Sequence, residues 1–392
     1  MRDRMLKLLR WSATHPGTRA LYRYLPITSR QIGPPRVEMS NAGYAQRYGA
    51  DITQLDDAEH HDRAYPFYVG PDQDVFLGRV LPSLPANSVL KVRGARMVGP
   101  HGWTIGQGDA FLPEASWYRD DSSSCGVHTL LRVRPKRRIE GRTISLASDW
   151  ASSNYLHFLL DALPRLELME EAGVSAEQVD HMIVPDLPSR AGQEILEVLR
   201  IPNGKVIPLS SLGTVEFEEL VLTSYPGIRR NVSRRQTSFV RHRVAPTSRG
   251  SGRRIYVSRG ARARRRIANE GDIIQVLERN GFETYTPGHG IDDLRVFSEA
   301  AIITGAHGAG LANMGACAPG TAVLEVLPHG FLYPYFYTLA TSACCTYACI
   351  VGEPGQKNPR TDNFHVDVGK FERLLSQVIA GGVEIGVAGF HR

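Results

Sequence analysis

Glycines in the stretch Ile302–Asn313 form the pattern with the clearest chemical meaning. A short apolar run leads into Gly305, Gly308 and Gly310, with His307 after the first of them. Without side chains in the way, backbone N–H groups at the start of a helix can converge on a phosphate. The spacing matches neither the dinucleotide-binding fingerprint nor the Lys-Ser/Thr ending of a P-loop. The stretch therefore predicts a phosphate-binding turn of another kind, such as one that holds a nucleotide sugar.

Arginines dominate a second motif, which begins at Tyr256–Arg259 and continues through Arg262, Arg264–Arg266 and Glu270. Arg259 is expected at the end of a strand, with one of Arg264–Arg266 behind it. Two such guanidinium groups can hold a diphosphate leaving group when no metal ion neutralises it. A solvated charge run and an RNA-binding surface are the alternatives. Aromatic residues are sparse in this segment, which argues against RNA.

His157 and Asp161 stand four residues apart in a segment with helical spacing, so they share one helix face. A carboxylate beside an imidazole orients the ring and raises its basicity, as a general base for a hydroxyl acceptor requires. Spacing alone favours a simpler interpretation, in which the histidine pairs with its neighbour for stability.

Two acidic motifs have both a functional and a structural interpretation. Glu325 lies in an apolar strand, where a carboxylate is costly unless it is paired or lines a site. Its partner is either a ribose or sugar hydroxyl or a structural cation. Asp72 and Asp74 form an Asp-x-Asp sequence, a pattern that many sugar transferases use to hold a metal, but it lies in a Gly-Pro loop. We interpret it as a turn and predict no metal site.

Four sequence blocks together resemble glycosyltransferase family 61, which includes bacterial enzymes of the capsular-polysaccharide type as well as plant and animal members. The blocks occur in the family's order over about residues 150–345, whereas residues 1–145 and the C-terminal tail contribute little. They read Asn154-Tyr155-x-His157-Phe158-x-x-Asp161-x-Leu163-Pro164-Arg165-Leu166, Tyr256-Val257-Ser258-Arg259 with Arg265-Arg266-Ile267-x-Asn269-Glu270, Gly305-x-His307-Gly308-Ala309-Gly310-Leu311-x-Asn313-Met314, and Val323-Leu324-Glu325-Val326.

The resemblance implies a GT-B fold with two facing Rossmann-like domains, and an inverting transfer of a sugar from a nucleotide-sugar donor to a glycan or lipid-linked acceptor. A UDP-sugar is the expected donor, and such enzymes commonly need no metal or other cofactor. In this family context a functional His157 is favoured. The alternatives are a catalytically silent module that binds a nucleotide or sugar phosphate, and an RNA-binding protein. The resemblance gives catalytic roles to His157 and Asp161, acceptor-side positions to Asn154, Tyr155 and Arg165, and donor binding to Arg259, Arg265, Arg266, Glu270, Gly305, His307, Gly308, Ala309, Gly310, Asn313 and Glu325.

The elements that must position these residues alternate between strands and helices, which predicts an α/β fold with parallel sheets. Ser152 or Ser153 should cap the first helix and Pro164 should break it. We expect a β-rich N-terminal extension at 1–145, an acceptor-side Rossmann-like domain at 146–250, and a nucleotide-sugar-binding Rossmann-like domain with a C-terminal helix at 251–392. The expected strands are Val89–Arg93, Leu130–Arg134, Ile144–Leu146, His181–Pro185, Lys205–Leu209, Leu220–Thr223, Arg254–Arg259, Phe282–Tyr285, Ala301–Thr304 and Ala322–Leu327, and the expected helices are Asn154–Met169, Arg190–Leu199, Asn269–Asn280, Asp292–Ala300 and Phe371–Ile379.

The composition agrees with a globular protein of two domains, since the 392 residues are 42% hydrophobic and 22% charged. The net charge of +6 permits an anionic substrate, a membrane surface or nucleic acid without selecting one. Five cysteines without a Cys-x-x-Cys pair fit a reducing compartment, and Cys344, Cys345 and Cys349 are expected in one helix. The sequence contains no apolar run of about 18 residues, the length that a transmembrane helix needs. A cytoplasmic protein is therefore expected. The basic segment Met1–Trp11 could lie on the inner face of a membrane, although an ordinary first helix is preferred.

Overall fold

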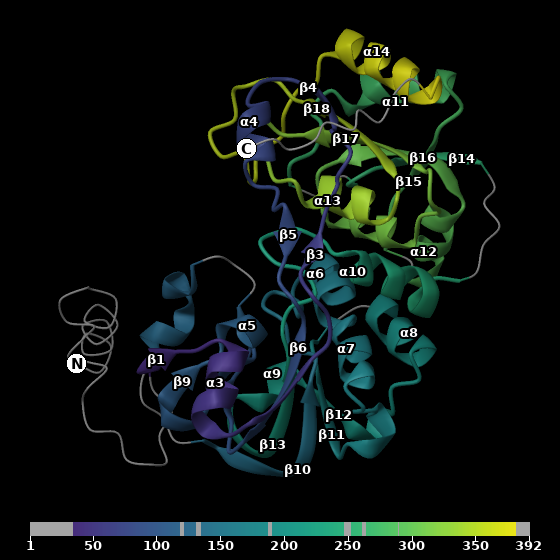
Figure 1. Cartoon of the computed structure of the whole chain (residues 1–392). Coiled ribbons are helices and arrows are strands. Elements are labelled where there is room, and N and C mark those ends of the chain that lie inside the picture. Colours follow the sequence, from purple (N-terminus) through teal and green to yellow (C-terminus); the bar gives the residue numbers. More distant parts are fainter. Residues whose placement is uncertain are drawn as a thin grey trace, which may run out of the picture. The chain divides into compact units, whose positions relative to one another are not determined.

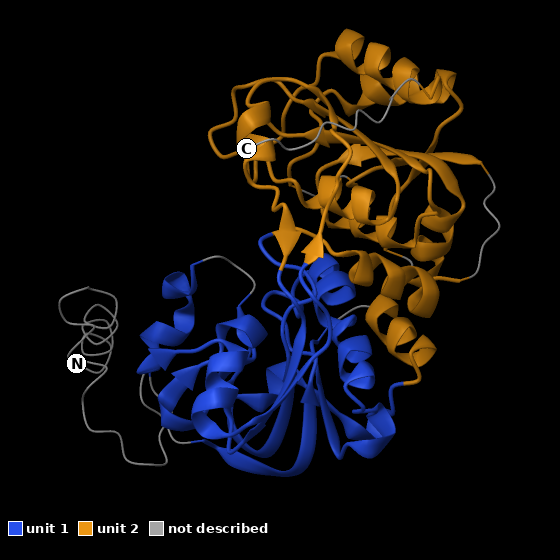
Figure 2. Cartoon of the chain, viewed as in Figure 1, with its two compact units in different colours: residues 1–58, 85–188, 201–229 blue, residues 59–84, 189–200, 230–392 orange. Residues whose placement is uncertain are grey.

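The structure is a computed structural model of the chain, and it describes residues 34–117, 121–130, 135–186, 190–246, 252–260, 264–288 and 290–381. These residues form two compact units, shown in blue and orange in Figure 2. Unit 1 takes its residues from 1–58, 85–188 and 201–229, and unit 2 from 59–84, 189–200 and 230–392. Each unit contains a large sheet with parallel strand pairs, as the predicted α/β fold class requires.

Unit 1 is built on a ten-stranded mixed sheet (Figure 1). Four neighbouring strands, β13, β10, β11 and β12, pair in parallel, while β6 and β7 pair antiparallel with β13. Buried residues such as Leu90, Phe217 and Leu220 form its core. The strands are β1 (Val37–Glu38), β2 (Asp51–Gln54), β6 (Ser88–Arg93), β7 (Arg96–Val98), β8 (Trp103–Ile105), β9 (Ala110–Phe111), β10 (Arg137–Ser145), β11 (His181–Val184), β12 (Val206–Pro208) and β13 (Thr214–Thr223).

The helices of unit 1 are mostly short. The predicted helix Asn154–Met169 is divided into α6, a π-helical turn η4 and α7, and Pro164 immediately precedes α7, in agreement with the predicted break. Its cap is Asn154, not a serine, because the extended backbone of Asn154 lets its side chain accept from the N–H of Leu156. The helices are α3 (Asn41–Tyr48), η1 (Gln107–Asp109), α5 (Pro113–Ser116), η2 (Ser122–Ser124), η3 (Gly126–Thr129), α6 (Tyr155–His157), η4 (Phe158–Ala162), α7 (Arg165–Glu171), η5 (Ala176–Gln178), η6 (Asn203–Lys205) and α9 (Leu209–Leu212).

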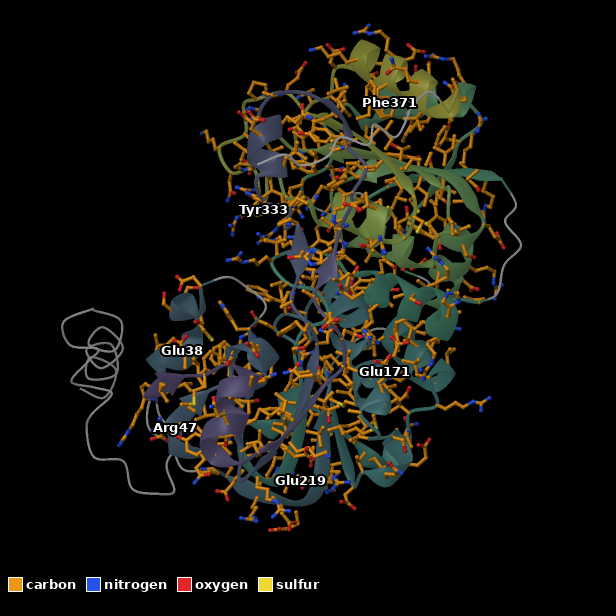
Figure 3. The ribbon with its side chains drawn as sticks, viewed as in Figure 1. Glu38, Arg47, Glu171, Glu219, Tyr333 and Phe371 are labelled. Carbon is orange, nitrogen blue, oxygen red and sulfur yellow. The ribbon has the colours of Figure 1, made fainter. Side chains whose placement is uncertain are left out.

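Unit 2 is built on a six-stranded sheet in the order β15-β14-β16-β17-β18-β4, and every pair in it is parallel. Phe371 of α14, labelled in Figure 3, is fully buried in the core of this unit with Leu324 and Ile350. The strands are β4 (Phe67–Val69), β14 (Arg253–Val257), β15 (Glu283–Tyr285), β16 (Ala300–Ala306), β17 (Ala322–Leu327) and β18 (Thr346–Val351), with a separate pair β3 (Glu59–His60) and β5 (Ser83–Leu84). The helices are α4 (Gln73–Leu77), α8 (Arg190–Val198), α10 (Arg234–Phe239), η7 (Val240–Val244), α11 (Glu270–Arg279), α12 (Ile291–Ser298), η8 (Ala309–Ala316), α13 (Tyr335–Ser342) and α14 (Val368–Ile379).

Residues of the expected N-terminal extension contribute to both units. Strands β6 and β7 join the sheet of unit 1 through β13, whereas β4 extends the sheet of unit 2 through β18. Alternating residues mark a strand locally, but they do not encode the distant partner with which it pairs. The predicted strand Leu130–Arg134 lies largely outside the described residues, as do Arg262 and Met1–Trp11.

The predicted helix with three cysteines is wrong. Cys344 and Cys345 follow the end of α13, and Cys349 lies in β18. The segment around Cys349 alternates β-branched, aromatic and small residues, which suits a buried parallel strand better than a helix. All five cysteines are free thiols. Among the described residues, no helix has the length and apolar character needed to cross a membrane.

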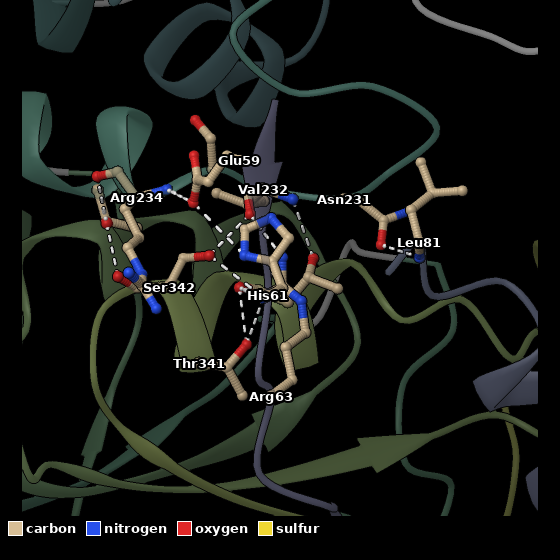
Figure 4. Close-up of polar contacts among 12 residues, drawn as sticks. Glu59, His61, Arg63, Leu81, Asn231, Val232, Arg234, Thr341 and Ser342 are labelled. Carbon is tan, nitrogen blue, oxygen red and sulfur yellow. Dashed lines mark hydrogen bonds and ion pairs between the residues drawn. The ribbon is translucent and has the colours of Figure 1, made fainter. Parts of the chain in front are cut away.

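Arg63 ties the segment before β4 to the rest of unit 2 (Figure 4). Its guanidinium donates to the carbonyl oxygens of Thr338 at 2.9 Å and Val232 at 2.9 Å, and also to the hydroxyls of Thr341 and Ser342. A buried arginine that satisfies several carbonyls in this way holds distant segments together. The chain entering unit 2 is therefore fixed by hydrogen bonds as well as by its strand.

The packing around Arg63 can be tested through the pH dependence of stability, because His61 lies two residues before it in the chain. Burial, assisted by the charges of Arg63, Arg234 and His60, lowers the pKa of His61 from 6.5 to about 4. Between those values the unfolded chain binds a proton that the folded chain does not, so stability falls as the pH falls. Solvent screening reduces the effect. We expect the titration of His61 to lower the free energy of unfolding by about 1 kcal/mol between neutral pH and pH 5.

The measurement is the urea midpoint for wild type and His61→Gln at both pH values. The variant cannot titrate at this position and should therefore show a smaller loss of stability on acidification. His365→Gln, at an exposed position of the same unit, is the matched control and should behave as wild type. An equal acid-induced loss in wild type and His61→Gln would contradict the prediction.

Candidate functional site

The predicted donor-binding residues meet at one edge of the sheet of unit 2. Arg259 follows the carboxyl end of β14, and the glycine turn follows the carboxyl end of β16, its parallel neighbour. The chain places β15 on one side of β14 and β16 on the other. The order of strands therefore reverses between β14 and β16, and in open α/β sheets ligands bind beside the carboxyl ends of strands at such a point.

Gly308 allows the side chain of Arg259 to approach the glycine turn. The Arg259 guanidinium donates from Nη1 to the carbonyl oxygen of His307 at 2.8 Å and from Nε to that of Arg264 at 2.8 Å. A Cβ added at Gly308 would lie 1.4 Å from Nη1 of Arg259, so a side chain here would displace the guanidinium from its place against the turn. Burial lowers the pKa of Arg259, which means that its charge lacks compensation by solvent.

Two further arginines lie near the turn with unused donors. Nε and Nη1 of Arg265 and Nε of Arg266 are buried and donate to no partner in the part of the chain that the structure describes. The Arg265 guanidinium lies 4.6 Å from the ring centroid of Phe331. Burial, with a smaller contribution from Arg259, lowers the pKa of Arg265 to about 10. Buried guanidinium donors without partners are costly, and an anion would satisfy them.

His307 is held by a buried carboxylate. Its Nδ1 lies 2.5 Å from Oε1 of Glu325, whose other oxygen accepts from the hydroxyl of Tyr347. Glu325 is wholly buried. The sequence left open whether its carboxylate pairs with another side chain or with a ligand, and in the structure its partners are His307 and Tyr347. Burial lowers the pKa of His307, although Glu325 opposes the shift. The carboxylate therefore orients the ring and leaves Nε2 as its remaining polar atom.

The other predicted donor residues make mainly local contacts. Glu270 accepts from the hydroxyls of Tyr256 at 2.7 Å and Ser258 at 3.0 Å. The side-chain amide of Asn313 donates to the carbonyl oxygen of Gly310 at 3.2 Å, and this asparagine is buried. Such contacts fix the ends of β14 and η8. Gly305 is the next-to-last residue of β16, and Ala309 and Gly310 begin η8, where the first N–H groups have no acceptor within the helix.

His157 and Asp161 form a pair inside unit 1. Nδ1 of His157 lies 2.6 Å from Oδ2 of Asp161, and both side chains are buried. Because an ionised carboxylate only accepts, Nδ1 carries the hydrogen and Nε2 is left as the basic atom. Asp161 lies in the π-helical turn η4, a type of distortion that often occurs at functional sites.

The predicted acceptor-side residues surround this pair. Asn154 caps α6, and Tyr155 is its first residue. Arg165 is fully buried: its Nε donates to the carbonyl oxygen of Asp161 at 3.2 Å, and its Nη1 donates to that of Ala115 at 3.0 Å. Its guanidinium also lies 4.0 Å from the ring centroid of Tyr225. Arg165 thus supports its neighbours from the interior of the unit.

Comparison with known proteins gives the family. Residues 155–324 match the model of the family Glycosyltransferase 61. Over these residues the chain is similar to glycosyltransferase family 61. The resemblance stated from the four sequence blocks is therefore confirmed, and with it a glycosyltransferase as the general class of activity. No curated protein matches the sequence. The matched segment includes the His157–Asp161 pair and the glycine turn, and it ends one residue before Glu325.

Sequence reasoning missed the aromatic residues beside the glycine turn. Phe331 contacts the ring of His307 edge-on at 5.3 Å between centroids, and Tyr333 contacts Phe331 in the same way at 4.7 Å. The guanidinium groups of Arg230 and Arg79 lie 3.7 Å and 4.5 Å from the centroid of Tyr333. Both aromatic residues follow the carboxyl end of β17. Arg259 was selected because it follows the end of a predicted strand, and the same criterion could have selected Phe331 and Tyr333 from the sequence.

No group of three or more His, Cys, Asp and Glu side chains with the arrangement of a metal site occurs among the residues described. The Asp-x-Asp sequence begins helix α4, with Asp72 in a left-handed backbone conformation just before the first helical residue. The predicted turn is therefore wrong for Asp74, which lies within α4. The cations near the glycine turn are arginine side chains.

Proposed function

We propose that the chain is an inverting glycosyltransferase of the GT-B type, in which unit 2 binds a nucleotide-sugar donor and unit 1 binds a glycan or lipid-linked acceptor. The observation that carries the proposal is the set of buried guanidinium groups beside the glycine turn. Arg259 donates to two carbonyl oxygens, Arg265 lies against the ring of Phe331, and Nε and Nη1 of Arg265 have no partner among the described residues. A diphosphate supplies the charge and the acceptor oxygens that these groups need.

The donor site would act on the leaving group. As the bond between the anomeric carbon and the diphosphate oxygen breaks, its electron pair and negative charge pass to the diphosphate. Arg259, Arg265 and the N–H groups at the start of η8 stabilise that charge in place, without reorganisation of solvent. Glu325 keeps His307 in a fixed orientation beside them. These arginines can neutralise the leaving group without a metal ion, and we propose a metal-independent reaction.

The acceptor side would supply the base. Nε2 of His157 takes the proton from an acceptor hydroxyl, and the oxygen attacks the anomeric carbon from the side opposite the diphosphate, which inverts the configuration. Asp161 stabilises the imidazolium that forms, through the bond to Nδ1. The proton remains on His157 until it exchanges with solvent.

The proposal is tested first by nucleotide binding. We expect UDP or a UDP-sugar to raise the melting temperature of the chain, since a ligand at a hundred times its Kd stabilises the folded state by about 2.7 kcal/mol. The screen includes GDP, CMP and their sugar conjugates, each with Mn²⁺ and with EDTA. A shift that survives EDTA supports metal-independent donor binding. No shift with any nucleotide, or one that EDTA abolishes, would contradict the corresponding part of the proposal.

A further inference from the structure

A cavity of about 590 Å³ opens within unit 1 and belongs to none of the assigned sites. Its wall includes Ser224 and Tyr225, which follow the carboxyl end of β13, and Gln54, the last residue of β2. Ser88, the first residue of the antiparallel strand β6, lies at the same edge because it is close to the end of β13. The cavity therefore lies at the carboxyl end of β13, a strand that pairs in parallel with β10, and ligand sites in α/β folds lie at such strand ends.

The lining combines aromatic rings with neutral hydrogen-bonding groups. Trp117 and Tyr225 supply the rings, and the indole N–H of Trp117 is already bonded to the carbonyl oxygen of Asp121 at 3.1 Å. The hydroxyls of Ser88 and Ser224 accept bonds from Asn41 and from the backbone N–H of Ser88, respectively. Their hydrogens have no acceptor among the described residues, so both can donate to a ligand.

Glu114 adds an acceptor to the same wall. One of its oxygens accepts from the backbone N–H of Asn41 at 2.8 Å, while no bond to the other is present in the described residues. Arg229 also lines the cavity, so the lining holds one acidic and one basic residue. Pockets for small organic ligands are mostly apolar with a few placed polar groups and span about 300–1,000 Å³. Serine donors, a carboxylate acceptor and aromatic faces suit the hydroxyls and C–H faces of an uncharged sugar.

The cavity is joined to the His157–Asp161 pair by buried contacts. Tyr225 packs on the guanidinium of Arg165, which also bonds the carbonyl oxygens of Asp161 and of Ala115, beside the cavity residue Glu114. The hydroxyl of Tyr225 accepts from the backbone N–H of Asp149 at 3.0 Å, in the loop that leads from β10 to α6. Each of these residues belongs to unit 1. The wall of the cavity and the proposed base are thus linked by a continuous set of contacts.

We propose that this cavity binds a neutral sugar ring of the acceptor, and that residues before the family segment 155–324 thereby determine which acceptor is used. Trp117, Glu114, Ser88 and Gln54 all precede that segment. The proposal rests on the proposed glycosyltransferase function. Within one family, variation in the N-terminal strands and loops can then change the acceptor, while the donor turn and the His157–Asp161 pair stay the same.

The test fills the cavity without touching the base or the donor site. Ala42 lines the cavity at an exposed position of α3, and Gln46, one turn later on the same helix, is exposed and does not line it. Ala42→Trp and the control Gln46→Trp are compared with wild type by saturation-transfer NMR. The probes are methyl glycosides of glucose, galactose, mannose, N-acetylglucosamine, xylose and rhamnose, and the corresponding β-linked disaccharides. UDP binding is measured on the same samples by thermal shift.

We expect wild type and Gln46→Trp to bind at least one of these glycosides, and Ala42→Trp to bind it at least tenfold more weakly, a change of about 1.4 kcal/mol, with the UDP shift unchanged. Binding of no glycoside by wild type, or equal binding by Ala42→Trp, would overturn the assignment of the cavity. Failure of the proposed function has a different signature: no nucleotide produces a shift, whatever the glycosides do. The two failures are therefore distinguishable.

Discussion

Replacement of Arg259 by alanine is expected to lower turnover at least a hundredfold while the protein stays folded. Its guanidinium lies against the glycine turn with its charge poorly solvated, so its interaction with a developing negative charge is strong. Removing one preorganised donor from such a site typically costs a factor of about 10²–10³ in rate. Turnover is measured as the release of nucleoside diphosphate from the nucleotide sugar that the binding screen identifies.

Two variants make the result specific to this position. Arg279→Ala removes an exposed arginine on α11 of the same unit, one that pairs with Glu372, and should leave turnover near wild type. Arg259→Lys keeps the charge but loses the planar group that bonds two carbonyl oxygens at once, so we expect only partial recovery. Near-normal turnover in Arg259→Ala, with a normal melting temperature, would show that this arginine does not hold the leaving group.

The elements of unit 2 could be predicted closely because each one is marked by local sequence. Residues 322–327 form a continuous apolar run apart from Glu325, and β17 has these bounds. The helix expected at Asn269–Asn280 is α11, which ends just before Gly281, a glycine with a φ of 74° that a left-handed turn requires. Burial on both faces gives parallel strands their apolar runs, so this kind of sheet is visible in a single sequence.

The pairing of distant segments was not predictable in the same way. Nothing around Phe67–Val69 indicates that it pairs with β18, nearly three hundred residues later. Similarly, Tyr347 could not be linked to Glu325 without knowing that β17 and β18 are neighbours. These contacts depend on which strand lies beside which, and side-chain alternation does not carry that information.

The same distinction between local sequence signals and distant pairing applies to the candidate site. Arg259 and His307 of the predicted donor site each follow the carboxyl end of a strand, and a simple rule about strand ends finds them. The partners that fix them do not follow such a rule: Glu325 holds His307 from a neighbouring strand, and Phe331 lies under Arg265 from a loop. The sequence therefore predicts which groups would bind a donor, whereas the structure shows which residues orient them.

Replacement of His157 by alanine is expected to abolish most sugar transfer while donor binding stays intact. General-base catalysis contributes a factor of about 10²–10⁴, and we expect a loss of transfer in that range. The proposed nucleotide site consists of residues of unit 2, so the thermal shift expected with UDP should be unchanged. The combination separates a transferase from a silent nucleotide-binding module, because such a module would have no transfer activity to lose.

Asp161→Asn tests whether the pair acts together. The amide can donate to Nδ1 of His157 where the carboxylate only accepts, and it cannot stabilise an imidazolium, so we expect a loss of roughly a hundredfold. Added imidazole should restore part of the transfer in His157→Ala, since the free base can enter the space that the ring has left, but it should not help Asp161→Asn. A pair that only stabilises the fold would lower the melting temperature of both variants without any rescue by imidazole. The rescue therefore distinguishes a base from a structural histidine, which the spacing of the two residues in the sequence could not do.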